Sequence, residues 1–335
     1  MKTNNFDGLR LVAALSVPVS HQYVNLGRPE PMPFGELTLG GLAVLLFFSI
    51  SGYLVASSWN ADPKVWRFAI RRLLRILPAY VVVVIGAALY IGLTDSRPLA
   101  TTAAWMYVYK HLTFHAFEWD FFTGLIDARL NPPLWTITFE IYFYAALAAL
   151  ATVAGKYWGA ACAALVAIAC AVWGIGVPMF NPSNAAPVDN AVLFGTFFAF
   201  GAALFALPVL RTGSVTAAIV AAGALAYFSG SQAIGLALAI PALTIHIGTR
   251  SWPLLRDAAR FGDLSYGIYL WSWPVQQVVF TRLPEGSSFG VLLGTSLVAT
   301  LAVSMLSWHL IERPALKAKP AATAPWPRWL TLEKG

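Results

Sequence analysis

His21 is a titratable side chain inside a long apolar stretch near the start of the chain. An imidazole titrates near neutrality, so it can take a proton from a hydroxyl or deliver one to a leaving group. Arg10 stands eleven residues earlier, about three helical turns, which puts both side chains on one helix face roughly 16 Å apart. A neutral histidine that is hydrogen-bonded between helices fits the same pattern. The spacing makes His21 a candidate base and Arg10 a candidate partner.

Glu140 is a second ionisable group in an apolar environment, where a charge costs roughly 2.5–3.5 kcal/mol to insert. It follows Trp135 at the start of the apolar stretch 134–154. Both Glu140 and His21 lie six residues from the expected outer membrane surface, a depth of roughly 9 Å, which permits contact between them. A carboxylate beside His21 would fix the tautomer of the imidazole and raise its basicity. A carboxyl that stays protonated, or one that reaches water, is the alternative.

A basic run occupies residues 64–75, just before the third apolar stretch. Arg71 and Arg75 are four residues apart and Arg72 and Arg75 are three apart, so a helix would gather them on one face. Guanidinium groups bind phosphate oxygens through paired N–H donors, which makes this face a candidate phosphate site. Anchors beside anionic lipid have the same composition, and charge alone favours the anchor.

Membrane helices must position these groups. The chain is 58% apolar and 11% charged, whereas soluble domains average about 25% charged residues. Apolar runs of about 20 residues can cross a hydrocarbon core of about 30 Å. The sequence therefore predicts an all-α, polytopic membrane bundle of about ten transmembrane helices. The segments are 9–27, 37–58, 76–94, 134–154, 157–177, 190–209, 214–230, 232–248, 264–281 and 289–311.

The distribution of basic residues orients this bundle. With these segments, 17 of the 22 Lys and Arg residues lie on the side of the N-terminus and five on the other side. Positive charge resists translocation, so we expect both termini in the cytoplasm and the protein in the cytoplasmic (inner) membrane. The net charge of +7 then belongs to the inner membrane surface, and no nucleic-acid partner is expected.

The chain is expected to form one transmembrane domain, residues 1–314, followed by an irregular basic cytoplasmic tail, residues 315–335. The longest loop, about 95–133, is rich in aromatic residues and is expected to lie outside, along the membrane surface. We find no internal sequence repeat, which weighs against a secondary transporter.

Six segments between Phe6 and Pro314 resemble the motifs of the acyltransferase 3 family of membrane acyltransferases. They are FDGLR at 6–10 followed by His21, FFSISGYL at 47–54, Arg72 and Arg75 followed by ILPAY, LW at 134–135 continuing to EIYFY at 140–144, SYGIYLWSWP at 265–274, and residues 308–314. Two positions depart from the family pattern. Ser272 stands where many members have histidine, and Leu45 and Leu46 stand where an acidic residue is common.

The resemblance implies an O-acyltransferase that moves an acyl group, most simply acetyl, from acyl-coenzyme A to a carbohydrate hydroxyl. Exopolysaccharide, lipopolysaccharide or another surface glycan, lipid-linked forms included, would be the acceptor. Arg72 and Arg75, together with Arg71 and Arg10, would hold the phosphates of the donor. Acetyl-coenzyme A would be a co-substrate, and no metal or tightly bound cofactor is implied.

The resemblance also implies roles for the remaining candidates. His21 would act as general base or carry the acyl group transiently, and Glu140 would orient His21 or position the acceptor. Trp135, Tyr269 and Ser272 are candidates for acceptor binding or support.

Two alternative hypotheses outside this enzyme class assign functions to the same residues. A carrier or flippase for a lipid-linked sugar would use the buried charges as a substrate path and leave the sugar covalently unchanged. A coenzyme A-binding sensor would bind its ligand equally well without His21.

Overall fold

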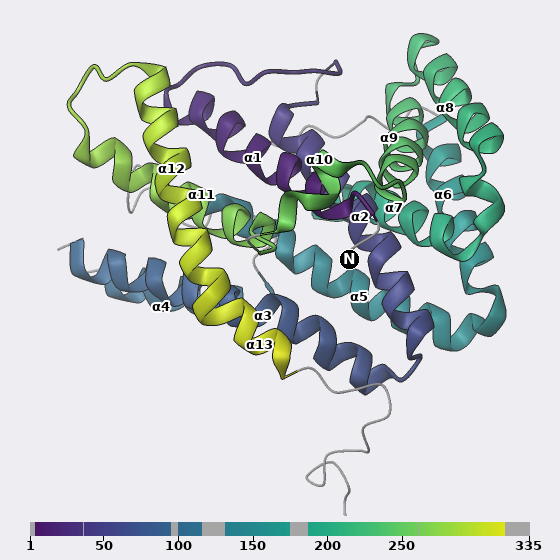
Figure 1. Ribbon diagram of the computed structural model, residues 1–335, viewed down its shortest axis with the longest axis horizontal. Helices are drawn as coiled ribbons and strands as arrows, with labels where there is room; N and C mark the ends of the chain where they lie inside the picture. The colour runs from purple at the N-terminus through teal and green to yellow at the C-terminus, as the bar shows by residue number, and fades with distance from the viewer. Residues whose placement is uncertain are drawn as a thin grey trace, which may run out of the picture.

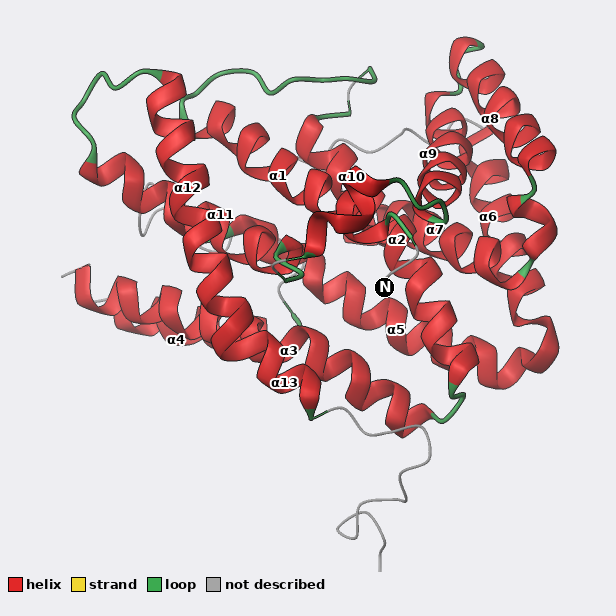
Figure 2. Ribbon diagram, in the orientation of Figure 1, coloured by secondary structure: helices red, strands yellow, loops and turns green. Residues whose placement is uncertain are grey.

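The computed structural model describes residues 4–35, 37–94, 100–115, 131–174, 187–260 and 262–318. Within these ranges the chain folds into helices joined by turns and loops and contains no β-strand (Figure 1, Figure 2). The all-α prediction is confirmed for this part of the chain.

The order of helices follows the apolar pattern of the sequence. The α-helices are α1 (Phe6–Asn25), α2 (Leu39–Ala61), α3 (Val65–Thr94), α4 (Ala100–Leu112), α5 (Trp135–Ala154), α6 (Trp158–Gly174), α7 (Pro187–Ala206), α8 (Gly213–Phe228), α9 (Gln232–Gly248), α10 (Pro253–Arg256), α11 (Ser265–Arg282), α12 (Phe289–Ser307) and α13 (Arg313–Lys317). Shorter turns are η1 (Pro132–Leu134), η2 (Gly155–Tyr157), η3 (Pro208–Arg211), η4 (Asp257–Ala259) and the π-helical η5 (Trp308–Glu312). Each of the ten predicted segments overlaps an α-helix, whereas α4 was not predicted.

Several of these helices suit a bilayer. Five described helical stretches are long and apolar enough to cross one: Leu39–Ala61, Val65–Tyr90, Pro132–Gly174, Val188–Ala206 and Phe289–Lys317. Helices α8 and α9 are apolar but shorter. The chain is a membrane protein with several apolar helices, while the count of ten crossings and the side of each terminus stay predictions.

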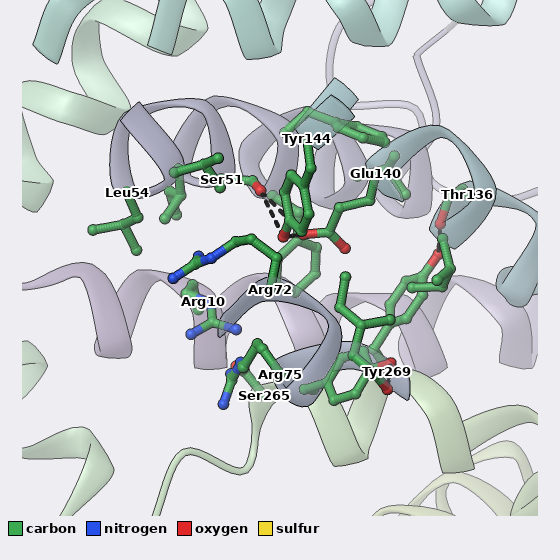
Figure 3. A pocket seen from close by; sticks show the side chains of 18 residues that line it. Arg10, Ser51, Leu54, Arg72, Arg75, Thr136, Glu140, Tyr144, Ser265 and Tyr269 are labelled. Carbon is green, nitrogen blue, oxygen red and sulfur yellow. Dashed lines mark hydrogen bonds between the residues drawn. The ribbon is translucent and has the colours of Figure 1, made fainter. Parts of the chain in front are cut away.

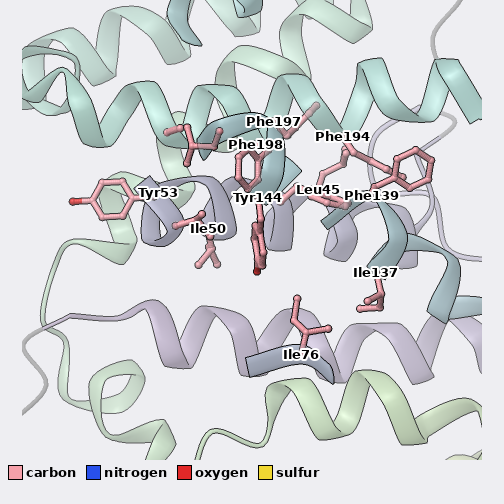
Figure 4. Close-up of a cluster of buried hydrophobic side chains, with 14 of the residues drawn as sticks. Leu45, Ile50, Tyr53, Ile76, Ile137, Phe139, Tyr144, Phe194, Phe197 and Phe198 are labelled. Atoms are coloured by element: carbon pink, nitrogen blue, oxygen red, sulfur yellow. The ribbon is translucent and has the colours of Figure 1, made fainter. Parts of the chain in front are cut away.

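Helix α2 lies in the middle of the bundle and packs against α7 through a dry, aromatic interface. A Cβ on Gly52 would stand 1.9 Å from the carbonyl oxygen of Phe198, so this position lets the two helices approach closely. Phe48 stacks on Phe194 with ring centroids 4.8 Å apart, and Phe139 of α5 meets Phe194 edge-on (Figure 4). This interface fixes α2 and α5, which both contribute to the site below.

Helices α1, α11 and α12 form a second group, beside α2 in Figure 1. Helices α1 and α11 run parallel. Arg10 near the start of α1 contacts Asp263 just before α11, and Asn25 at the end of α1 contacts Gln277 near the end of α11. Gln276 links them near the far end, because its Nε2 donates to the carbonyl of Pro18 at 2.7 Å.

The start of α5 is buried against the middle of α11. Asn131 Nδ2 donates to the carbonyl of Leu270 at 2.9 Å, and the hydroxyl of Tyr269 donates to the carbonyl of Pro133 at 2.7 Å. Pro132, Pro133 and Leu134 of η1 are all buried. The first turn of α5 therefore does not lie at the surface of the bundle.

Candidate active site

A narrow cavity of about 110 Å³ lies between α1, α2, α3, α5 and α11. Arg10, Arg72 and Arg75 line one side of it, and Thr136 and Tyr269 lie on the opposite side (Figure 3). The α2 residues that face it run from 44 to 55, which corresponds to roughly 16 Å of helix. The cavity is thus an elongated slot with a cationic end and an apolar end.

Arg72 is the arginine most available to a ligand. Its Nη2 donates to Ser58 Oγ at 3.2 Å, and its guanidinium lies 5.9 Å from the ring centre of Tyr144. Its Nε is buried and has no hydrogen-bond partner among the described residues. Among the described residues no carboxylate forms an ion pair with Arg72; the Glu140 carboxylate acts on its charge from further away, across the same cavity.

Arg10 and Arg75 share one carboxylate. Nη1 of Arg10 and Nη2 of Arg75 lie 2.7 and 2.6 Å from Oδ2 of Asp263, and Ser265 Oγ donates to Oδ1 at 2.7 Å. Burial alone would raise the pKa of Asp263, but the two arginines hold that pKa well below its ordinary value. This cluster ties α1, α3 and α11 together and leaves the remaining N–H groups of both arginines at the cavity.

The sequence did not indicate Asp263 as a site residue. It lies 253 residues from Arg10, so spacing along the chain carries no information about their contact. The one feature of the sequence that points to Asp263 is its position two residues before Ser265, where the SYGIYLWSWP motif begins.

Arg71 lies on α3 with Arg72 and Arg75 but is not among the residues that line the cavity, and its role in donor binding stays a prediction. Its Nη1 lies 2.6 Å from Oδ2 of Asp62 in the loop after α2, and its Nη2 donates to the Asp62 carbonyl at 3.1 Å. The hydrogen bond from Arg71 outweighs burial and lowers the pKa of Asp62. The physical reason is this local carboxylate, which holds Arg71 against the α2–α3 loop and away from the cavity.

Glu140 forms a network with two hydroxyl groups of the cavity wall. Its Oε1 accepts hydrogen bonds from Ser51 Oγ at 3.0 Å and from the hydroxyl of Tyr144 one helical turn later. Tyr144 is also the residue whose ring faces Arg72. The network therefore belongs to the cationic part of the cavity, as Figure 3 shows.

Glu140 and His21 lie at different depths, contrary to the depth estimate from the sequence. The backbone N–H of Gly40 donates to Ser20 Oγ at 2.9 Å, which fixes α2 against α1 at the level of His21. Ser51, the partner of Glu140, lies eleven residues further along α2, or roughly 16 Å. The estimate failed because the start of α5 is buried at the middle of α11.

His21 packs against α11. Its ring meets Trp273 edge-on with centroids 5.1 Å apart, and its Nδ1 is buried with no hydrogen-bond partner among the described residues. The apolar end of the cavity, at Val44, lies four residues from Gly40, or roughly 6 Å short of this level. A ligand that extends beyond the apolar end of the cavity points toward His21.

The other candidates divide between the cavity and its surroundings. Tyr269 lines the cavity, 2.5 Å from Thr136 Oγ1. Trp135 instead packs on Phe139 and Phe194, both at 5.6 Å between ring centroids. Ser272 is fully buried beside Trp273.

Part of the aromatic outer loop can also be located. Trp105 and Tyr109 on α4 are 70% and 61% exposed. The loop aromatics between 117 and 122 lie outside the described residues.

Comparison with known proteins identifies the class of molecule. Residues 3–309 match the acyltransferase 3 family, described as an acyltransferase domain. The chain belongs to this family. It is 34% identical to the O-acetyl transferase of Shigella phage Sf6, over 93% of this chain and 96% of the phage protein. No solved structure matches the chain.

Two further relatives have related names. Nodulation protein 10 of Rhizobium leguminosarum bv. viciae is 29% identical over 96% of this chain and 95% of its own length. The putative peptidoglycan O-acetyltransferase YrhL of Bacillus subtilis (strain 168) is 25% identical over 92% of this chain and 54% of its own length. This member of the acyltransferase 3 family is therefore a membrane O-acyltransferase.

Proposed function

We propose that this acyltransferase moves an acetyl group from acetyl-coenzyme A, held at the cationic end of the cavity, to a carbohydrate hydroxyl at His21. The observation that carries the proposal is the cavity, with three arginines at one end and apolar residues at the other, where it ends at Val44, roughly 6 Å short of the level of His21. The names of two relatives, an O-acetyl transferase and a putative peptidoglycan O-acetyltransferase, support acetyl as the group and a glycan as the acceptor.

The donor fits the cavity by charge and by shape. Coenzyme A carries phosphates that guanidinium groups bind through charge-assisted hydrogen bonds. Arg72 supplies the free charge, and Arg10 and Arg75 supply further donors from a position set by Asp263. The thin pantetheine arm then follows the apolar residues Phe47 and Val44 and brings the thioester toward His21.

The chemistry follows from the position of His21. As general base it takes the proton of a sugar hydroxyl while the hydroxyl oxygen attacks the thioester carbonyl and the thiolate leaves. In the alternative mechanism, imidazole attacks the thioester first and passes the acetyl group to the sugar. In both, Nδ1, which is buried and lacks a protein partner among the described residues, would take its hydrogen bond from substrate or water.

Glu140 takes a different role from the one that its predicted contact with His21 suggested. Through Tyr144 it supports the wall beside Arg72, and through Ser51 it fixes a hydroxyl that faces the donor. We propose that this network positions the donor.

The membrane arrangement is proposed to follow the charge distribution. Ten transmembrane helices would form a domain over residues 1–314, with both termini and the tail over 315–335 in the cytoplasm of a cell whose inner membrane holds the protein. Arg72 then faces the side that supplies acyl-coenzyme A. The acceptor, free or lipid-linked, reaches His21 from the outer side.

The test uses membranes that contain wild-type or His21→Ala protein at matched abundance, supplied with acetyl-coenzyme A labelled in the acetyl group. Base-labile label in the carbohydrate and lipid-linked fractions is expected with wild type and absent with His21→Ala. Equal label with both proteins would remove His21 from the chemistry. Sugar moved across the membrane with no label incorporated would favour a carrier and contradict the proposal.

A further inference from the structure

The buried face of α12 consists almost entirely of hydroxyl side chains. Its buried residues are Leu292, Ser296, Thr300, Ser304 and Ser307. The opposite face is apolar and open, with Val298 70% and Leu306 60% exposed. We name Ser296, Thr300, Ser304 and Ser307, together with Ser272 of α11, the hydroxyl seam. In Figure 1, α12 lies along α11, the helix against which the hydroxyl seam packs.

Four of the five hydroxyl groups of this seam are buried without partners among the described residues. Ser272, Ser296 and Ser304 are 0% exposed and Thr300 is 1% exposed. None of their four hydroxyl oxygens has a hydrogen-bond partner among the described residues. A buried hydroxyl that makes no hydrogen bond is destabilising, so the three on α12 and the one on α11 require an explanation.

Other buried or partly buried hydroxyl groups on helices of this protein avoid the free-energy cost of a missing hydrogen bond. A serine or threonine in a helix can donate to the carbonyl four residues earlier. Ser49, Thr152 and Thr196 do so at 2.8, 2.7 and 2.7 Å. The hydroxyl groups of Ser296, Thr300 and Ser304 do not, although their helix offers the same carbonyls, and this leaves them available to a ligand between the helices.

One end of the hydroxyl seam meets a buried carboxyl group. Ser307 Oγ donates to Glu312 Oε1 at 3.0 Å, and Glu312 Oε2 is buried without a partner among the described residues. Glu312 ends the π-helical turn η5, and extra residues of this kind recur at functional positions of helices. Arg75, Asp263 and Arg10 are the charged groups that act on this carboxyl.

The other end of the hydroxyl seam leads to His21. Ser272 is adjacent in sequence to Trp273, whose ring contacts the imidazole of His21. Gln276 lies one turn after Ser272 on α11, and Gln22 follows His21 on α1. Gln276 Oε1 and Gln22 Nε2 are also buried without hydrogen-bond partners in the described ranges. Unsatisfied polar atoms therefore occur on all three helices of this group, α1, α11 and α12.

The spacing of the hydroxyl groups fits water. Successive members on α12 are three or four residues apart, or roughly 4.5–6 Å. One water that makes two hydrogen bonds of about 2.8 Å each bridges such a gap. Side chains that are almost fully buried leave no opening for a sugar, and a lipid chain would leave the hydroxyl groups unsatisfied.

We propose that the hydroxyl seam binds a file of water molecules that transfers protons between His21 and Glu312. The role in catalysis rests on the proposed function. His21 takes the proton of the acceptor hydroxyl, the file passes a proton through Glu312 to water at the inner surface, and the departing thiolate takes a proton from that water. One proton leaves the acceptor and one reaches the thiol, so the reaction balances.

The kinetic test compares Thr300→Val, which keeps the shape and removes the hydroxyl, with Thr300→Ser, which keeps the hydroxyl. With labelled acetyl-coenzyme A and membranes that contain the natural acceptor, Thr300→Val is expected to lower kcat at least about tenfold and leave KM for the donor unchanged. Its kcat should also fall further in D₂O than that of wild type. Thr300→Ser should restore both values.

Thr196→Val is the matched control, because Thr196 is buried but bonds to its own helix and should show no effect. A wild-type kcat and solvent isotope effect in Thr300→Val would overturn the proton role. Equal losses in Thr300→Val and Thr300→Ser would also do so, because packing would then be the cause.

A second measurement does not need the acceptor. Purified protein in lipid nanodiscs is exposed to X-ray radiolysis, which makes hydroxyl radicals from bound water, and oxidised residues are located by mass spectrometry. Ile268, which packs beside Leu301 and Trp308 at the hydroxyl seam, should be oxidised more than Ile245, which is equally buried (both 0% exposed) in the main hydrophobic core. Oxidation of Ile268 at the level of Ile245 would overturn the water file, even if His21→Ala abolishes transfer. Failure of wild type to transfer acetyl would refute the proposed function and the proton role, while the oxidation pattern would still report the water.

Discussion

The arginine end of the cavity and the His21 end are built differently. At the first, Arg10 and Arg75 are held by Asp263, and their positions are set before a ligand arrives. At the second, His21 Nδ1 and Ser272 Oγ are buried without partners among the described residues. In the proposed function, the donor site is therefore preorganised by the protein, whereas the groups around His21 would obtain their hydrogen bonds from substrate and water.

The largest expected effect is on kcat, and it should distinguish the His21 end from the arginine end of the cavity. His21→Asn should lower kcat by about 10²–10⁴, the range typical of general acid–base catalysis. Binding of coenzyme A, measured by titration calorimetry on purified protein, should stay unchanged because Arg10 is about 16 Å from His21 along α1, and Arg75 shares Asp263 with Arg10. Equal loss of coenzyme A binding would show that the two ends are not independent.

The next effect concerns the donor. Arg72→Met should weaken coenzyme A binding by about 10–100-fold, as expected for loss of a hydrogen bond between charged groups worth about 1.5–3 kcal/mol. Arg71→Met is the control, because Asp62 holds Arg71 away from the cavity. If both variants weaken binding equally, the assignment of the phosphate site to Arg72 is wrong.

Loss of Asp263 should reduce stability in a pH-dependent way. The pKa of Asp263 is lowered in the folded protein, so its contribution is present above the ordinary aspartate value near 4 and is lost as the pH falls below it. Asp263→Asn should therefore lower Tm at pH 7, and the difference from wild type should narrow below about pH 4. A constant difference from pH 7 to pH 3, measured by thermal unfolding in detergent, would contradict this.

The smallest effect is expected at Glu140. Glu140→Gln keeps its size and a hydrogen-bond acceptor for Ser51 and Tyr144, so a loss of less than about tenfold in kcat/KM is expected, in line with about 1 kcal/mol for an ordinary hydrogen bond. A loss as large as that of His21→Asn would restore Glu140 to the reacting centre. The comparison requires both variants in the same labelled-acetyl assay.

The helices were predictable because long apolar runs are a local property of the sequence. The placement of groups from different helices was not. Asp263 meets Arg10 across 253 residues, and Asp62 draws Arg71 away from Arg72. Both contacts depend on packing that spacing does not encode.

The level of each site residue along the helix bundle was the hardest feature of the site to predict. Counting from the start of α5 placed Glu140 at the level of His21, but η1 is buried at the middle of α11, so the count began in the wrong place. The unsatisfied hydroxyl groups of α12 are also not predictable from the sequence, because serine and threonine in an apolar helix usually bond to their own backbone.

The most direct test of the account is an experimental structure with a thioether analogue of acetyl-coenzyme A bound. The account predicts a phosphate within hydrogen-bond distance of Arg72, the pantetheine arm along Phe47 and Val44, and the acyl end beside His21. An analogue whose acyl end stops at Ser51 and Glu140, or whose phosphates lie away from Arg72, would contradict it.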